Sequence, residues 1–158
     1  LKLNDLEKKV VYTELSRKLN VAWYRNQSRN LNASLAIPYK LGGEWENMYP
    51  DFIFFQRTND GKIVRTIVDP HGDWLGDSVA KLKGYVAYLR DHPNMFGSVL
   101  AVADEKVGKE MKYLYLDLMN TEVQNAIDDF SGSSAKELFL GDLSRPYRIK
   151  SDESDSDS

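Results

Sequence analysis

The stretch PDFIFFQRTNDGKIVRTIVD, residues 50–69, holds two apolar runs separated by a short polar segment. The Asn-Asp-Gly of residues 59–61 tolerates the backbone angles that tight turns require, so the stretch predicts a β-hairpin. A hairpin folds the start of its first strand back beside the end of its second strand. Asp51 and Asp69 occupy those two places, and we therefore expect them to be neighbours.

The length of the turn decides whether the two aspartates share a face of the sheet. A three-residue turn with Gly61 in the left-handed region sets Asp51 directly opposite Asp69. A two-residue turn would instead pair Asp51 with Pro70 and direct the two carboxylates to opposite faces. The order Asn-Asp-Gly favours a type I turn followed by a glycine bulge, so we expect the three-residue turn.

The composition predicts one folded domain and a short acidic tail. The 158 residues suffice to bury about two-thirds of the unfolded surface. We expect a domain over residues 1–150 and a disordered tail over residues 151–158. The net charge of −3 becomes +1 when the four acids of that tail are left out, so the domain itself is close to neutral.

Several classes of protein are excluded by the sequence. The chain has no cysteine, which excludes disulfides and thiolate chemistry. It has no apolar run of about 18 residues, so we expect no membrane partner, and it lacks the apolar core of a signal peptide. We expect a cytoplasmic protein. Because the chain begins with Leu1 and not with methionine, we also expect it to be part of a longer protein.

Periodicity predicts an α/β sandwich around a central mixed β-sheet. Residues 26–49 have no clear period and are expected to form a long loop, which would be a wall or lid over residues 50–51. Residues 137–140 are expected to be a last strand or a docking segment. The remaining elements are helices at residues 4–19, 75–92 and 121–130, and strands at residues 21–24, 52–55, 63–68, 96–103 and 111–118.

The first predicted helix carries an acidic residue within its apolar arc. Asn4 and Glu7 form a capping box, which explains the position of Glu7. Glu14 lies in the same arc without such an explanation, and a buried carboxylate is costly without a partner or a cation. We therefore expect Glu14 to point toward Asp51 and Asp69.

Two close carboxylates repel each other unless one is protonated or a cation lies between them. Mg²⁺ suits such a pair, since it takes one or two carboxylates, water and phosphate oxygens. His71 follows Asp69 by two residues and shares its face if the strand continues. Asp51, Asp69, Glu14 and His71 are thus one predicted site.

This arrangement resembles the PD-(D/E)xK nucleases, in which a Pro-Asp begins one strand and an Asp/Glu-x-Lys ends the next. Asp69-Pro70-His71 is similar to the second element, with histidine in place of lysine. Residues 6–118 also resemble the C-terminal nuclease-like domain of bacterial DEAD/DEAH helicases related to type III restriction subunits. The segments that carry this second resemblance are Trp23-Tyr24-Arg25-Asn26, Ile37-Pro38-Tyr39, Tyr49-Pro50-Asp51-Phe52 and Val68-Asp69-Pro70-His71-Gly72.

The resemblance implies a restriction-endonuclease-like fold and metal-dependent hydrolysis of DNA phosphodiesters. Asp51, Asp69 and Glu14 would hold Mg²⁺, with Mn²⁺ as a substitute, and His71 would orient the attacking water. Lys81 or Lys83 could replace the missing lysine. Arg25 and Arg29 are interleaved with Trp23 and Tyr24, a pattern that suits contacts to DNA phosphates and bases, and solvated charges at a helix end and on a strand explain it equally well. With a nuclease fold, Lys83 is a further candidate for contact with DNA. The resemblance also implies an attached N-terminal helicase with its ATPase.

Two other functions remain open at this point. The first is a degenerate nuclease fold that binds DNA or a protein partner without cutting. The second is an interaction domain in which Trp23, Trp45 and Trp74 form a protein interface.

Overall fold

The hairpin predicted at residues 50–69 lies at the centre of the fold. The computed structural model describes residues 2–27, 33–71 and 76–150. Strands β4 (Phe52–Arg57) and β5 (Ile63–Pro70) pair antiparallel, with Ile53 opposite Ile67. Gly61 has φ of 82°, and its N–H donates to the Thr58 carbonyl oxygen at 2.9 Å. The three-residue turn and its register are confirmed.

Six strands form the main sheet, in the order β1-β4-β5-β6-β7-β8. Strands β5 and β6 are parallel and every other neighbouring pair is antiparallel, so the predicted mixed sheet is confirmed. Strands β2 and β3 form a separate two-stranded sheet. The remaining strands are β1 (Asn20–Arg25), β2 (Ile37–Leu41), β3 (Glu44–Met48), β6 (Ser98–Val107), β7 (Glu110–Asp117) and β8 (Arg145–Pro146).

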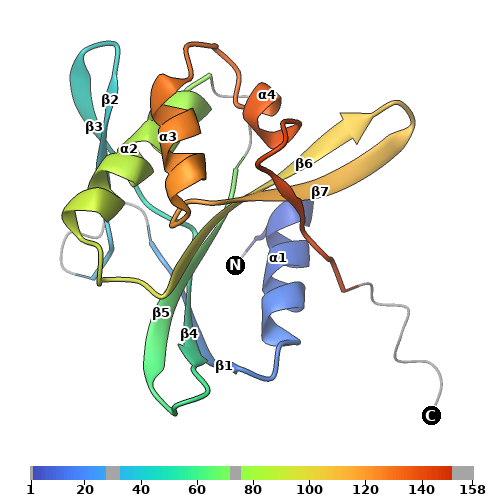
Figure 1. The fold of residues 1–158 in the computed structure, drawn as a ribbon. Helices are drawn as coiled ribbons and strands as arrows, with labels where there is room; N and C mark the ends of the chain where they lie inside the picture. The colour runs from blue at the N-terminus through green and yellow to red at the C-terminus, as the bar shows by residue number, and fades with distance from the viewer. Residues whose placement is uncertain (1, 28–32, 72–75, 151–158) are drawn as a thin grey trace.

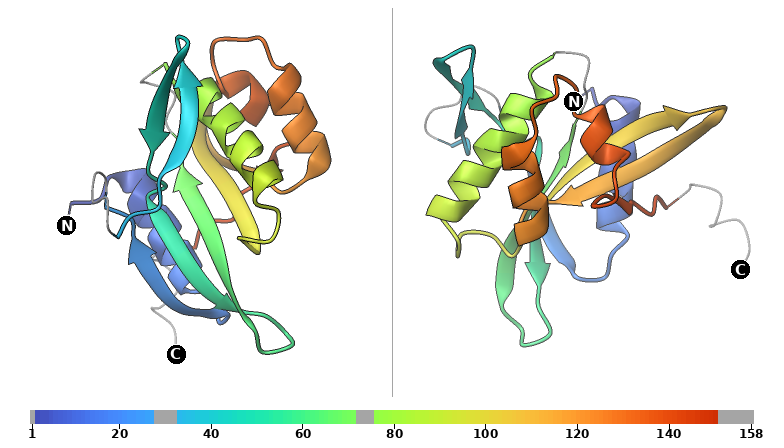
Figure 2. Two further views of the ribbon diagram at one scale, coloured as in Figure 1. Left: turned by 90° about the vertical axis from the view of Figure 1, so that its left-hand side faces the viewer. Right: turned by 45° about the horizontal axis from the view of Figure 1, so that its top comes forward.

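The helices cover both faces of the main sheet. Helices α2 (Ser78–Asp91) and α3 (Thr121–Asp129) lie side by side on one face (Figure 1). Helix α1 (Asp5–Leu15) packs on the opposite face, as the turned views also show (Figure 2). A short helix, α4 (Lys136–Phe139), lies where a last strand or docking segment was expected.

Two hydrophobic cores follow from the alternation of side chains along the strands. Phe52 and Phe54 of β4 pack with Val10 of α1, whereas Ile53 packs with Leu82 of α2. Odd-numbered positions of β4 thus face α2. Asp51 continues that alternation, so it is placed on the side of the sheet that α2 covers.

The first helix begins as predicted. The Glu7 N–H donates to Asn4 Oδ1 at 2.8 Å, and the Asn4 N–H donates to Glu7 Oε2 at 2.7 Å. The capping box is confirmed. The helix ends at Leu15, before the predicted residue 19, and the Asn20 side chain donates to the Glu14 carbonyl oxygen there.

The expectation of a long loop over residues 26–49 was wrong. This part of the chain contains the β2–β3 hairpin, whose turn is formed by Gly42 and Gly43 with φ of 58° and 88°. The hairpin packs against α2 at Gly84, where a Cβ would overlap the Tyr39 side chain and lie 3.1 Å from the Pro38 carbonyl oxygen. The close approach therefore depends on the absence of a side chain at position 84.

None of the helices formed by the described residues is both long enough and apolar enough to cross a membrane. The predicted acidic tail, residues 151–158, lies outside the described residues.

Candidate functional site

The Asp69 carboxylate is held at the end of β5 by two hydrogen bonds. Its Oδ1 accepts from the Asp51 backbone N–H at 3.0 Å, and its Oδ2 accepts from the Tyr85 hydroxyl of α2 at 2.8 Å. Both aspartates are partly buried. The prediction that the hairpin brings Asp51 and Asp69 together is confirmed.

Burial and like charges shift the pKa of Asp51. Its pKa is raised to about 7, chiefly by burial, then by the negative charges of Asp69 and Glu7. The positive charges of Arg25 and Lys81 act in the opposite direction. Asp51 therefore lies where two carboxylates and two cations meet.

Burial also raises the pKa of Asp69. The charge of His71, the two hydrogen bonds from Asp51 and Tyr85, and the charge of Lys81 oppose this shift. The pKa of Tyr85 is raised well above its usual value, by burial and then by Asp69, so this hydroxyl stays a donor. A bound proton or cation would therefore stabilise this pair of aspartates.

Helix α2 contributes one stripe of polar side chains to this site. Lys81 Nζ lies 2.9 Å from Asp77 Oδ2, and the Tyr39 hydroxyl donates to the same oxygen at 3.3 Å. Asp77, Lys81 and Tyr85 recur at four-residue spacing, which places them on one side of the helix. Lys81 is the lysine whose positive charge acts on both aspartates.

Glu7 and Arg25 approach Asp51 from α1 and β1. Arg25 lies 3.6 Å from Glu7 Oε1, and its guanidinium lies 6.0 Å from the centroid of the Phe52 ring. The predicted contact of Arg25 with DNA stays a prediction. Glu7 combines its capping role with a charge that acts on Asp51.

The expectation that Glu14 points toward Asp51 and Asp69 was wrong. Its Oε1 accepts from the Tyr147 hydroxyl at 2.8 Å and lies 3.3 Å from the Arg17 side chain. Tyr147 belongs to the core between α1 and the sheet, on the face opposite α2. Glu14 is therefore a buried carboxylate with its own partners, and we no longer propose it as a metal ligand.

His71 is buried beside Asp69. Its Nε2 lies 3.0 Å from the Ser78 carbonyl oxygen, so this nitrogen carries the proton and donates. Its backbone N–H donates to the Val102 carbonyl oxygen at 2.6 Å, and its ring lies 6.2 Å from that of Phe139. This packing ties β5 to the start of α2 and leaves only Nδ1 for a water or a metal ion.

The remaining predicted site residues lie elsewhere. Lys83 extends from α2 toward α3 and donates to the Asp128 carbonyl oxygen at 3.3 Å. Arg29 and Trp74 lie outside the described residues. Within residues 2–27, 33–71 and 76–150, no three His, Cys, Asp or Glu side chains form a group that could hold a metal ion.

Sequence reasoning missed Tyr85 and gave Glu7 only a capping role. The four-residue spacing of residues 77, 81 and 85 was available as a signal, since it places three polar side chains on one side of the predicted helix. No comparable signal distinguishes Glu7 from Glu14.

Comparison with known proteins places the chain in a family. The model of the YagJ family matches residues 1–148. Protein YagJ of Escherichia coli strain K12 is 34% identical over 146 residues, which cover 92% of this chain and 57% of that protein. The chain thus spans less than two-thirds of the length of this curated relative. No solved structure was found to match. With nearly its whole length matched, the chain belongs to the YagJ family.

Proposed function

We propose that this chain is a nuclease-type domain that hydrolyses phosphodiester bonds of DNA with the help of a divalent metal ion. The observation that carries the proposal is the meeting of Asp51 and Asp69 at one end of the β4–β5 hairpin, where the positive charge of Lys81 acts on both carboxylates. This combination of two acids and a lysine supports the resemblance to the PD-(D/E)xK nucleases and to their fold.

The donor set suits Mg²⁺ or Mn²⁺. Asp51 and Asp69 both have raised pKa values, so their negative charges are poorly compensated by the protein alone. Among the described residues, none donates a hydrogen bond to the Asp51 carboxylate. Mg²⁺ commonly takes one or two carboxylates and fills its other positions with water and phosphate oxygens, so two aspartates are enough.

Each side chain of the site has a distinct task in this proposal. Asp51 and Asp69 would hold the ion, and Tyr85 keeps the Asp69 carboxylate in place. The ion would polarise a phosphoryl oxygen and lower the pKa of a bound water. Lys81 would stabilise negative charge on the phosphate, and Arg25 would bind a neighbouring phosphate.

Lys81 replaces the lysine that the family pattern places two residues after the second acid. An ammonium keeps its charge at neutral pH, whereas His71 has one nitrogen committed to Ser78. Asp77 holds Lys81 at 2.9 Å and so fixes the direction of its side chain. His71 is then a positioning residue that connects β5 to α2.

A cleavage assay tests the proposal. The wild-type chain and four variants would be incubated with single-stranded and linear duplex DNA in Mg²⁺, Mn²⁺ or chelator. Asp69→Asn and Lys81→Gln should each lower cleavage by on the order of 100-fold, because each removes a charge that acts on the phosphate. His71→Ala should lower thermal stability and reduce cleavage less than Lys81→Gln does.

Glu14→Gln is the matched control. It changes a buried carboxylate on the opposite face of the sheet, so cleavage should persist once the folded fraction is accounted for. Cleavage that survives Asp69→Asn would indicate a contaminating enzyme and would contradict the proposal.

A second function has one observation in its favour. The described residues lack a third metal ligand, and both Asp69 oxygens already accept hydrogen bonds from the protein. A domain of this fold that binds DNA or a protein partner without cutting it would have the same features. DNA binding without cleavage by any form, in either metal, would favour this alternative.

A further inference from the structure

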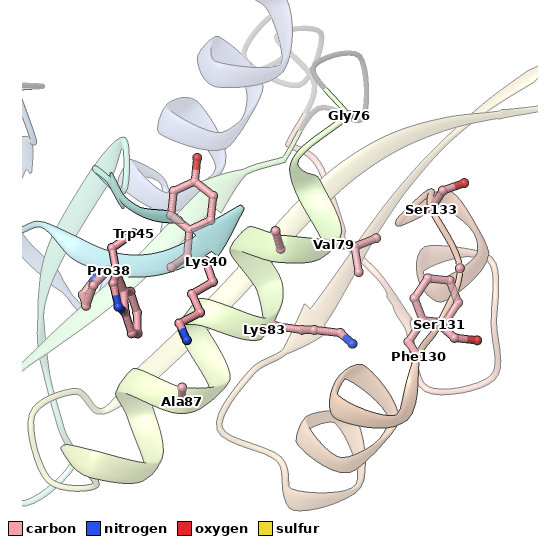
Figure 3. A pocket seen from close by; sticks show the side chains of 14 residues that line it. Pro38, Lys40, Trp45, Gly76, Val79, Lys83, Ala87, Phe130, Ser131 and Ser133 are labelled. Carbon is pink, nitrogen blue, oxygen red and sulfur yellow. The ribbon is translucent and has the colours of Figure 1, made fainter. Parts of the chain in front are cut away.

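A groove runs along the side of α2 that faces away from the sheet. It has a volume of about 550 Å³ and lies between α2, the β2–β3 hairpin and residues 130–133 (Figure 3). Such a volume is typical of ligand-binding clefts. The groove is separate from the Asp51 and Asp69 pair but shares α2 with it.

The side chains of the groove combine positive charge with an exposed aromatic surface. Trp45 is 68% exposed, and Lys40 Nζ lies 5.0 Å from the centroid of its ring. Lys83 extends from α2 toward Phe130 and Ser131 (Figure 3). The described residues that line the groove include both lysines and no carboxylate.

These features fit a nucleic acid in its single-stranded form. A tryptophan face offers a stacking surface for a base, and lysines offer charge to the phosphates on either side. Bases of a duplex are stacked on each other and do not expose a face to a side chain. The groove has two lysines and no carboxylate among its described lining residues. A polyanion such as a nucleic acid supplies the negative charge that these lysines would bind, whereas an uncharged peptide does not.

A short chain of contacts joins the groove to the carboxylate pair. Tyr39 lines the groove, and its hydroxyl donates to Asp77 at 3.3 Å. Asp77 pairs with Lys81, whose charge acts on both Asp51 and Asp69. Tyr39 and Asp77 therefore connect the wall of the groove to Lys81.

We propose that the groove binds single-stranded nucleic acid, with a base stacked on Trp45 and phosphates held by Lys40 and Lys83. The proposal deepens the proposed function, on which it rests for the identity of the ligand. It assigns the proposed nuclease a single-stranded substrate path, and it gives Lys83 a role away from the metal ligands.

Binding is measured separately from cleavage. Fluorescence anisotropy of a labelled oligothymidylate, in chelator and at low salt, gives the affinity of the 158-residue chain and its variants. Trp45→Ala should weaken binding by about tenfold, since stacking of one base contributes about 1–3 kcal/mol. The double change of Lys40→Gln and Lys83→Gln should lower the slope of log K against log salt by about 1.4, at about 0.7 per phosphate for a single strand.

Lys109→Gln is the matched control. Lys109 is an exposed lysine in the turn between β6 and β7, outside the groove, and its loss should leave the affinity and slope near those of the wild type. A duplex of the same length should bind more weakly, and its affinity should not depend on Trp45. Circular dichroism checks that each variant is folded.

The possible results separate this proposal from the proposed function. If binding depends on Trp45 but no cleavage occurs in Mg²⁺ or Mn²⁺, the proposal that the groove binds single strands is supported and the proposal of nuclease activity is overturned. If the wild type cleaves DNA and the Trp45→Ala variant binds as tightly as the wild type, only the proposal of binding in the groove is overturned. Failure of the wild-type chain to bind the oligonucleotide also overturns the groove.

Discussion

Asp51 binds a proton more tightly in the folded chain than in the unfolded chain. Its folded pKa of about 7 exceeds the usual value for an aspartate, about 3.9. Between these two values the folded state holds more protons, so the free energy of unfolding falls as pH rises. The stabilisation is fully present below about pH 4 and is lost as pH rises through about 7.

Asp51→Asn should remove this dependence. In chelator, the melting temperature of the variant should rise relative to the wild type between about pH 4 and pH 8, because the amide never acquires the charge. Added Mg²⁺ at about pH 8 should narrow the gap by stabilising the wild type alone. A difference between the two proteins that is the same at every pH would contradict this account.

Asp60→Asn is a suitable control for Asp51→Asn, because it also replaces an aspartate by asparagine. Asp60 is exposed in the turn between β4 and β5, and a hydrogen bond from Thr58 lowers its pKa. The pKa shift is opposite in sign to that of Asp51, so this variant should not gain stability relative to the wild type as pH rises.

Single residues also show where prediction from sequence succeeded and where it failed. The register of Asp51 and Asp69 depends on the local chemistry of the Asn-Asp-Gly turn, and it could be read from the sequence. Glu7 and Glu14 lie two helical turns apart on nearly the same side of α1. Which of them lies near Asp51 depends on how the helix crosses the sheet, and that is decided by packing far along the chain.

Helix α2 connects the carboxylate pair to the groove. One side carries Tyr85, which donates to Asp69, and another side contacts the β2–β3 hairpin at Gly84. The β2–β3 hairpin was not predicted, although Gly42 and Gly43 are a two-residue turn signal. Its strands alternate weakly, because four of the five residues of β3 are exposed.

Gly84→Ala tests the closeness of this contact. Alanine favours a helix over glycine by about 1 kcal/mol, but its Cβ would overlap Tyr39. Overpacking of this kind costs about 1–3 kcal/mol, so we expect a net loss of stability in urea unfolding.

Ala87→Gly on the same helix provides the comparison. Ala87 is exposed, and the change should cost about 1 kcal/mol through helix propensity alone. A gain of stability in Gly84→Ala would show that the helix and hairpin do not touch as described.

The two faces of the main sheet differ in the polar residues that they bury. The core under α1 contains Tyr147, which binds the buried Glu14, whereas Tyr85 of α2 binds Asp69 on the other face of the sheet. The mixed sheet and its helices were predictable from periodicity. The opposite placement of α1 and α2 was not, since periodicity identifies an apolar face but does not specify which face of the sheet it meets.

Charge distribution at this scale leads to a further prediction. The net charge of −3 includes four acids in residues 151–158. Deletion of these residues should strengthen binding of an oligonucleotide at low salt, because like charges repel the phosphates, and the gain should vanish at high salt. Anisotropy titrations at several salt concentrations measure this, and an equal gain at all concentrations would contradict it.

The register of the β4–β5 hairpin also limits how the length of this chain can change in evolution. Seven positions separate Asp51 from Thr58, and seven separate Lys62 from Asp69. Insertion of one residue in one arm moves one carboxylate to the other face, whereas an equal insertion in both arms preserves the pair. Relatives that keep both acids should therefore gain or lose residues in the two arms together.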